Sequence, residues 1–160
     1  MTTKLSTPRK TIICPVDFSP SSERALNHAA ERYAGDAEIV VLHVGNPGSG
    51  DAGSLLKEHL HHFSRYSDML SVYGCRVRFA VEYGTPSETI ITYAKAHNAD
   101  MIVLGTHGAS NISRLLVGST TETVMRHATC PVLILKSQEP AVTGAGSTRK
   151  TIAALSNIND

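Results

Sequence analysis

Short apolar runs alternate along the chain with longer segments in which apolar residues recur every three or four positions. The short runs are typical of strands buried on both faces, and the longer segments are typical of amphipathic helices. Strands are expected at residues 11–17, 38–44, 76–82, 101–104 and 131–135. Helices are expected at residues 22–34, 54–73, 87–97 and 120–127. This alternation predicts an α/β fold with a parallel sheet flanked by helices.

Local signals indicate where these helices begin and which faces they bury. Ser19 or Ser21 can cap the first helix, and Pro86 suits the first turn of the third. The inward-facing residues of the second helix are expected to be Leu55, Leu56, Leu60, Phe63, Tyr66, Met69 and Leu70.

Right-handed crossovers restrict the order of the five strands, and a doubly wound order of 3-2-1-4-5 is predicted. The first and fourth strands are then neighbours whose connections leave in opposite directions. Ligands bind beyond the carboxyl ends of strands at such a switch point. Asp17 ends the first strand and Gly105 ends the fourth, so both are expected at one crevice.

The loop after the fourth strand has an unusual glycine pattern. Gly105-Thr-His107-Gly108 is separated by nine residues from Gly118-Ser-Thr-Thr121, where a helix is expected to begin. Backbone amides, hydroxyl donors and the positive end of a helix suit a phosphate, and glycine lets the backbone approach it. The loop matches neither the Walker A nor the Rossmann fingerprint, since it lacks the lysine of the first and the glycine spacing of the second.

Length and composition indicate one domain without an obvious nucleic-acid or membrane partner. The chain has 160 residues, 41% of them hydrophobic, and a net charge of +1, whereas duplex binding favours a strongly basic surface. No apolar stretch near the N-terminus is long enough for a signal peptide or a membrane span. We expect a flexible N-terminus at 1–9, a domain at 10–136, and a disordered tail at 137–160 that is rich in Pro, Gly, Ser and Thr.

The cysteines and histidines do not predict a metal site. Cys14, Cys75 and Cys130 form no CxxC pair and read as small buried residues of a reducing compartment, which favours the cytoplasm. His59 and His62 share a helix face, but no second segment offers a completing ligand, so a solvent-facing cluster is expected.

Five short segments in order resemble the nucleotide-binding branch of the universal stress protein family. The matching segments are residues 14–19 (Cys-Pro-Val-Asp-Phe-Ser), 42–44 (Leu-His-Val), 84–86 (Gly-Thr-Pro), the loop 105–121, and 128–134 (Ala-Thr-Cys-Pro-Val-Leu-Ile). The resemblance therefore extends over most of the expected domain.

The resemblance implies that ATP, AMP or ADP binds, with or without an accompanying Mg²⁺. It puts Pro15, Val16, Asp17 and Val44 around the adenine and ribose. The residues implied around the phosphates and ribose are Gly105, His107, Gly108, Gly118, Ser119, Thr120 and Thr121, and Leu104 before them completes the set. Asp17 can accept hydrogen bonds from ribose hydroxyls, while amides and hydroxyls can donate to phosphate oxygens.

Plainer interpretations exist for the same residues. Asp17 could be a turn or cap residue, the glycines could serve only turns, and His107 and Arg114 could be solvated loop side chains. Three functions therefore compete: a nucleotide-responsive stress or regulatory module, a slow ATPase or phosphotransferase, and a dimeric interaction module that needs no ligand. The loop 105–121 contains no carboxylate to hold a metal, so no catalytic residue is assigned and turnover is expected to be poor.

The fifth strand predicts association between copies of the chain. It is apolar, it lies at a sheet edge in the expected order, and only Lys136 guards its end. The family resemblance implies a homodimer in which the last strands pair through Val132, Leu133 and Ile134.

Overall fold

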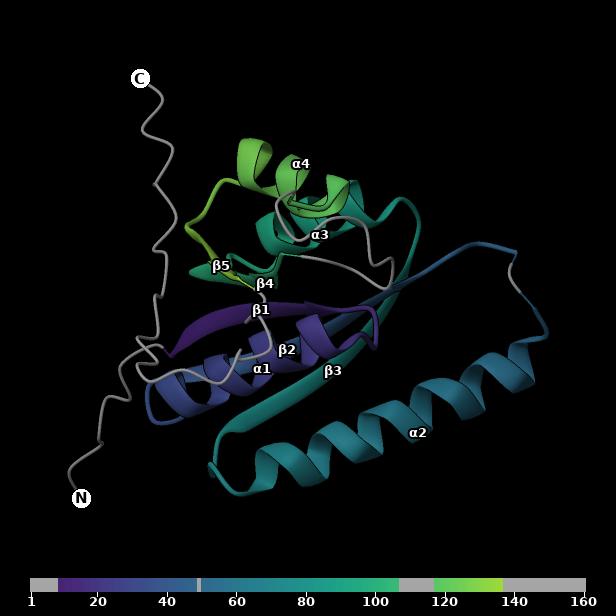
Figure 1. The fold of residues 1–160 in the computed structure, drawn as a ribbon, viewed down its shortest axis with the longest axis horizontal. Helices are drawn as coiled ribbons and strands as arrows, with labels where there is room; N and C mark the ends of the chain where they lie inside the picture. Colours follow the sequence, from purple (N-terminus) through teal and green to yellow (C-terminus); the bar gives the residue numbers. More distant parts are fainter. Residues whose placement is uncertain (1–8, 49, 107–116, 137–160) are drawn as a thin grey trace, which may run out of the picture.

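The computed structural model describes residues 9–48, 50–106 and 117–136. Five parallel strands form one sheet in the order β3-β2-β1-β4-β5, which confirms the predicted topology (Figure 1). The strands are β1 (Lys10–Val16), β2 (Ala37–Gly45), β3 (Arg76–Tyr83), β4 (Met101–Gly105) and β5 (Val132–Leu135). The helices are α1 (Pro20–Tyr33), α2 (Ala52–Ser71), α3 (Pro86–Ala96) and α4 (Ser119–His127).

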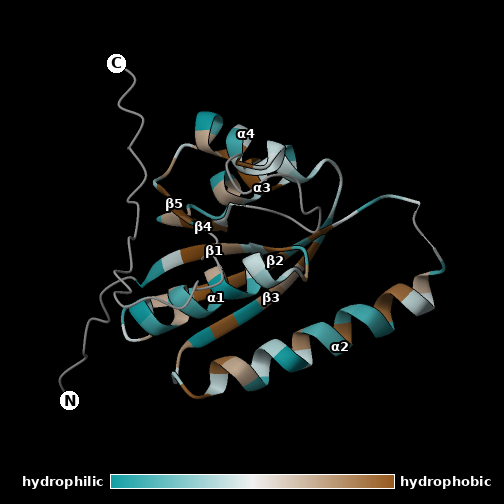
Figure 2. Cartoon of the chain, viewed as in Figure 1, coloured by the Kyte–Doolittle hydropathy of each residue, from teal (hydrophilic) through white to brown (hydrophobic). Residues whose placement is uncertain are grey.

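Helices cover both faces of this sheet, α1 and α2 on one side and α3 and α4 on the other (Figure 1). Side chains of each central strand alternate between the two cores. Ile12 and Cys14 of β1 pack with α1, whereas Ile13 packs with α3 and α4. Burial on both faces explains the nearly continuous apolar runs of the strands, which are brown in Figure 2.

The start of α1 is set by a side-chain cap. Ser19 is the N-cap, since its hydroxyl accepts a hydrogen bond from the Ser22 amide at 3.2 Å. Pro20 occupies the first turn, where its missing N–H costs nothing. Of the two candidate caps in the sequence, Ser19 is therefore the one used.

The second helix differs from the prediction in the face it buries. Tyr66 and Leu70 are buried as expected, but Leu56 and Leu60 are more than half exposed, at 58% and 59%. His59 is buried instead, so the histidines of this helix do not all face solvent. The cause is geometric, because the buried stripe of α2 runs through His59, Phe63, Tyr66 and Leu70, and Leu60 lies about 100° around the helix from His59.

Candidate functional site

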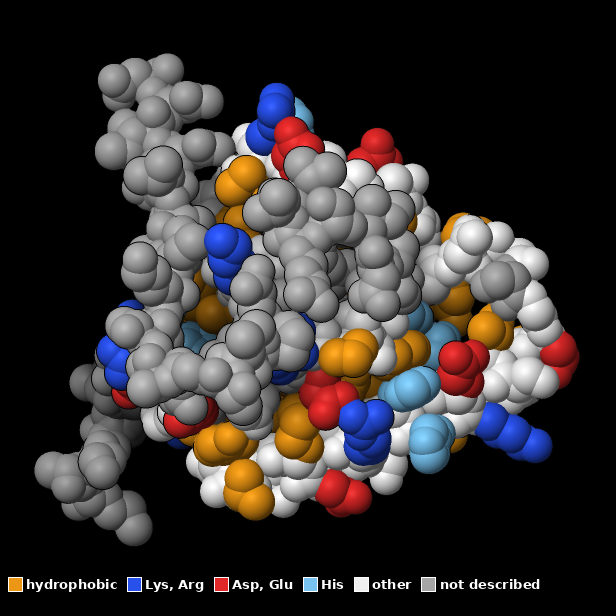
Figure 3. All heavy atoms as spheres, viewed as in Figure 1, with side chains coloured by type: hydrophobic (Ala, Val, Ile, Leu, Met, Phe, Trp, Pro, Cys, Tyr) orange, Lys and Arg blue, Asp and Glu red, His pale blue; other side chains and the backbone are white. Residues whose placement is uncertain are grey.

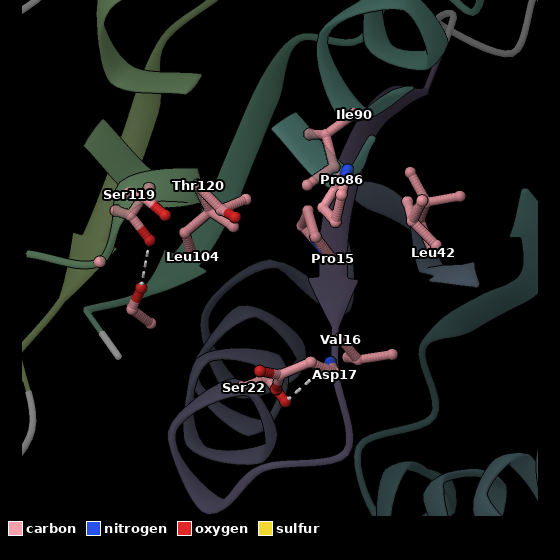
Figure 4. A pocket seen from close by; sticks show the side chains of 14 residues that line it. Pro15, Val16, Asp17, Ser22, Leu42, Pro86, Ile90, Leu104, Ser119 and Thr120 are labelled. Carbon is pink, nitrogen blue, oxygen red and sulfur yellow. Dashed lines mark hydrogen bonds between the residues drawn. The ribbon is translucent and has the colours of Figure 1, made fainter. Parts of the chain in front are cut away.

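A pocket lies at the carboxyl ends of β1 and β4, the neighbouring strands at the switch point of the sheet. Ten residues of the predicted site line it: Pro15, Val16, Asp17, Val44, Leu104, Gly105, Gly118, Ser119, Thr120 and Thr121. Residues from separate parts of the sequence therefore meet around one hollow (Figure 4). The predicted site residues His107 and Gly108, and also Arg114, lie outside the described residues.

Four further lining residues were not among the predicted ones: Ser22, Leu42, Pro86 and Ile90. Leu42 could have been found, because it lies two positions before Val44 and alternate residues of a strand share a face. Ser22 and Ile90 belong to helices whose packing against the sheet had to be known first.

The first turns of three helices reach the pocket. Ser22 belongs to α1, Pro86 to α3 and Ser119 to α4. The start of a helix carries unpaired amides and partial positive charge. Within the described residues, no side chain caps α4, whose N-cap is Gly118. The amides at the start of α4 can therefore serve an anion.

Gly105 is required by the packing around the pocket. A Cβ atom at this position would lie 2.8 Å from the carbonyl oxygen of Ser21, which is closer than real Cβ contacts. Glycine thus lets the end of β4 approach the first turn of α1. At Gly118, in contrast, the nearest atom to a Cβ would be the carbonyl oxygen of Thr106 at 3.5 Å, an ordinary contact.

Hydrogen bonds fasten the start of α4 to the end of β4. The Gly118 amide donates to the carbonyl oxygen of Thr106 at 2.9 Å, and the Thr121 hydroxyl donates to that of Gly105 at 3.0 Å. The Thr121 hydroxyl therefore has a structural partner. Ser119 and Thr120 remain as lining hydroxyl residues of α4 next to its first amides.

Asp17 combines the two interpretations that its sequence position allowed. Its Oδ1 accepts a hydrogen bond from the Ser19 amide at 3.1 Å, which closes a local turn. Its own amide donates to the Ser22 hydroxyl at 3.4 Å, as Figure 4 shows. Asp17 also lines the pocket. The hydrogen bond from the Ser19 amide therefore fixes the position of a carboxylate in the site.

The pocket lining is otherwise apolar or neutral. Among its described residues, Asp17 is the one acidic side chain and there is no lysine or arginine. Pro15, Val16, Leu42 and Ile90 form an apolar wall. The arrangement can accept a flat apolar group at one end and an anion at the start of α4.

Cys14 lies on the strand beside the pocket, and its surroundings disfavour the reactive thiolate. It is buried, and burial raises the pKa of its thiol, with nearby Cys75 adding to the rise. A thiolate is the reactive form, so this environment suits an inert core residue. No group of three His, Cys, Asp or Glu side chains within the described ranges is arranged to hold a metal ion.

The sequence profile of the universal stress protein family matches residues 8–136. The chain belongs to the universal stress protein family. Universal stress protein MJ0531 of Methanocaldococcus jannaschii is 33% identical over 141 aligned residues, with 79% of this chain and 82% of the relative covered.

Solved structures of the universal stress protein family share the fold. That of MJ0577, also of Methanocaldococcus jannaschii, has a TM-score of 0.73 at 28% identity and covers 84% of this chain and 100% of its own. A universal stress protein solved in complex with cAMP has a TM-score of 0.68 at 25% identity, with 82% and 100% covered. In residues 9–48, 50–106 and 117–136, no helix is both long and apolar enough to cross a membrane.

Proposed function

We propose that this universal stress protein binds an adenine nucleotide, ATP or AMP, in the pocket between β1 and β4. It then acts as a nucleotide-responsive module in the stress response. The observation that carries the proposal is the meeting of an apolar wall, the Asp17 carboxylate and the uncapped start of α4 in one pocket. A cytoplasmic location fits the free thiols of Cys14, Cys75 and Cys130.

Each part of a nucleotide has a chemically suitable partner in the pocket. The apolar wall of Val16, Leu42 and Ile90 suits a purine base, and the Asp17 carboxylate can accept hydrogen bonds from ribose hydroxyls. The amides of Ser119 and Thr120 at the start of α4 suit phosphate oxygens. The cAMP bound by a related protein combines the same base, ribose and phosphate.

We expect the protein to hold its nucleotide and to hydrolyse it slowly or not at all. Phosphoryl transfer needs carboxylates that hold a metal and a group that orients the attacking water. The described pocket offers Asp17 alone, and this side chain already accepts from the Ser19 amide. A Mg²⁺ ion that enters with ATP would therefore be held mainly by the phosphates and water.

The test is to identify what the protein carries. Protein purified without added nucleotide is denatured, and the released small molecules are identified by mass spectrometry. Calorimetric titration of the emptied protein with ATP, AMP, cAMP and adenosine then ranks the ligands. The amount of ATP hydrolysed over time in the presence of Mg²⁺ distinguishes a protein that only binds ATP from a slow ATPase. Binding of none of the four ligands would refute the proposal.

A second proposal concerns the homodimer. Strand β5 is the sheet edge next to β4, and its four residues are half-buried in the single chain. The Ile102 amide donates to the carbonyl oxygen of Pro131, and the Thr106 amide donates to that of Leu135. Because the direction of these groups alternates along a strand, the backbone groups of Val132 and Ile134 face outward. They could pair with β5 of a second copy across a two-fold axis.

A further inference from the structure

Phe18, the residue after Asp17, is held in an uncommon conformation. Its φ is 65°, in the left-handed region that bulky side chains rarely adopt. Such strain persists only where the surroundings enforce it. The backbone turn here directs the Phe18 ring away from the pocket that Asp17 lines and towards α2.

Two histidines enclose the Phe18 ring. The ring of His43, on β2, is stacked on it with centroids 4.3 Å apart, and the ring of His62, on α2, is stacked on it at 3.9 Å and 7°. Phe18 therefore joins the pocket loop to both β2 and α2. Figure 3 shows histidine side chains gathered on the surface over α2.

The histidine on the strand is fixed from a second direction. His43 Nδ1 lies 2.9 Å from the carbonyl oxygen of Val16, which can only accept, so Nδ1 carries the proton. The buried ring of His59 lies against His43 in an edge arrangement at 4.9 Å. Val16 and Asp17 both line the pocket, so these contacts hold the pocket wall from behind.

We propose that Phe18 is a positioning residue for the nucleotide pocket. His43 of β2 and His62 of α2 hold the Phe18 ring between them, and this keeps the Asp17 carboxylate at the pocket. The proposal rests on the proposed function for its effect on affinity. It also adds a role for α2, whose own residues do not line the pocket. Displacement of α2 would release the ring, relax the backbone at Phe18 and move Asp17.

Charge on His43 should loosen this arrangement, because the imidazolium would lose hydration in its partly buried place. Burial lowers the pKa of His43 and outweighs the opposing effect of the hydrogen bond to the Val16 carbonyl. His59 lowers this pKa further, and Asp17 and Glu58 act in the opposite direction. Burial also lowers the pKa of His62. The charged or titratable groups of α2 near the His62 ring are Glu58, His59, His61 and Arg65. Arg65 also forms an ion pair with Glu23 of α1.

The direction of the pH effect follows from these lowered pKa values. A lowered imidazole pKa means that the assembled cluster favours the neutral rings. Its contribution is therefore complete above the ordinary imidazole pKa of 6.5 and is lost as the pH falls through the lowered values. Adenosine is the suitable probe, because it carries no phosphate that titrates in this range.

The experiment measures adenosine affinity by calorimetry between pH 5 and 8. For Phe18→Leu we expect affinity about tenfold weaker at pH 8, the scale of one or two lost ring stacks. Phe18→Tyr, which keeps the ring, should bind adenosine as tightly as the wild type. The wild-type protein should bind more weakly below pH 6.5, and His43→Asn, which keeps a donor for the Val16 carbonyl, should flatten that profile.

His97 supplies a matched control. Its ring is stacked on Tyr93 at 3.9 Å and its Nδ1 lies 2.9 Å from the Tyr93 carbonyl oxygen, so its contacts resemble those of the histidines at Phe18. It caps the C-terminal end of α3, away from the pocket. His97→Asn should leave both affinity and pH profile unchanged, whereas a change equal to that of His43→Asn would overturn the specific role of Phe18.

A second measurement judges the positioning role without any ligand. The Ser19 amide donates to Asp17 Oδ1, so its hydrogen exchange reports whether the Asp17 carboxylate is in place. Exchange should be at least about tenfold faster in Phe18→Leu and normal in Phe18→Tyr. Unchanged exchange and unchanged affinity in Phe18→Leu would overturn the proposal. If the wild type binds no adenosine or ATP, the proposed function fails, and the exchange result alone decides the positioning role.

Discussion

Replacement of Gly118 by aspartate tests the phosphate end of the pocket. Gly118 has φ −62° and ψ 153°, which any residue adopts, and a Cβ there would meet only the Thr106 carbonyl oxygen at 3.5 Å. Aspartate is also a favoured N-cap, with an advantage over glycine of about a few tenths of a kcal/mol. The variant should therefore fold with an unchanged or raised melting temperature.

The same side chain should oppose a bound phosphate. It would accept from the first amides of α4 and bring a negative charge to the place where phosphate oxygens are proposed. Two unit charges about 4 Å apart repel by about 4 kcal/mol at an effective dielectric constant of about 20. Even after partial screening, ATP affinity should fall by at least about 100-fold. Adenosine affinity should change little, because adenosine has no phosphate.

Gly118→Asn is the matched variant, since it has the same shape and capping ability without the charge. Gly35→Asp is a second control, because Gly35 lies between α1 and β2 at the opposite end of the sheet, with nothing within 4 Å of a Cβ. Calorimetry with ATP and adenosine gives the affinities, and thermal unfolding monitors the fold. Equal ATP affinity in Gly118→Asp and Gly118→Asn would refute the phosphate assignment.

Three further predictions concern the rest of the site and the sheet edge. Asp17→Ala should weaken ATP and adenosine alike by about 10- to 100-fold, the scale of a hydrogen bond to a charged group, and full adenosine affinity in calorimetry would make Asp17 a turn residue only. Gly105→Ala should destabilise the fold by about 1–3 kcal/mol through its clash with Ser21, and chemical denaturation with no loss of stability would contradict that close approach. Ile134→Pro should convert the proposed dimer to monomer in light scattering, because it removes an outward amide. A wild-type protein that is monomeric well above micromolar concentration would exclude the dimer.

Strand positions and strand order followed from the sequence because burial on both faces leaves an unambiguous apolar run. Ile39, Val40 and Val41 are all fully buried, and a short run of β-branched residues favours a strand over a helix. The neighbouring positions of β1 and β4 then brought Asp17 and Gly105 to one pocket, since ligand sites of such sheets lie at the switch point.

Helix faces were predicted less well because periodicity does not say how much surface lies beneath a helix. Leu60 fits an apolar stripe but lies beside the buried face and is 59% exposed, whereas His59 is buried against Phe18 and His43. The sequence also gives no sign that Phe18 adopts a left-handed conformation. That property depends on two rings from distant elements, which only the folded chain brings together.

Under the proposed function, the uncapped start of α4 would link the amount of intact protein to its ligand. In the described structure no side chain caps this helix, whose N-cap is Gly118, so a bound phosphate would supply the missing acceptor. A ligand present at 100 times its dissociation constant stabilises the folded state by about 2.7 kcal/mol. Under the proposed function, depletion of the nucleotide would leave more chains open to proteases, and the abundance of the protein would report the cell's energy supply.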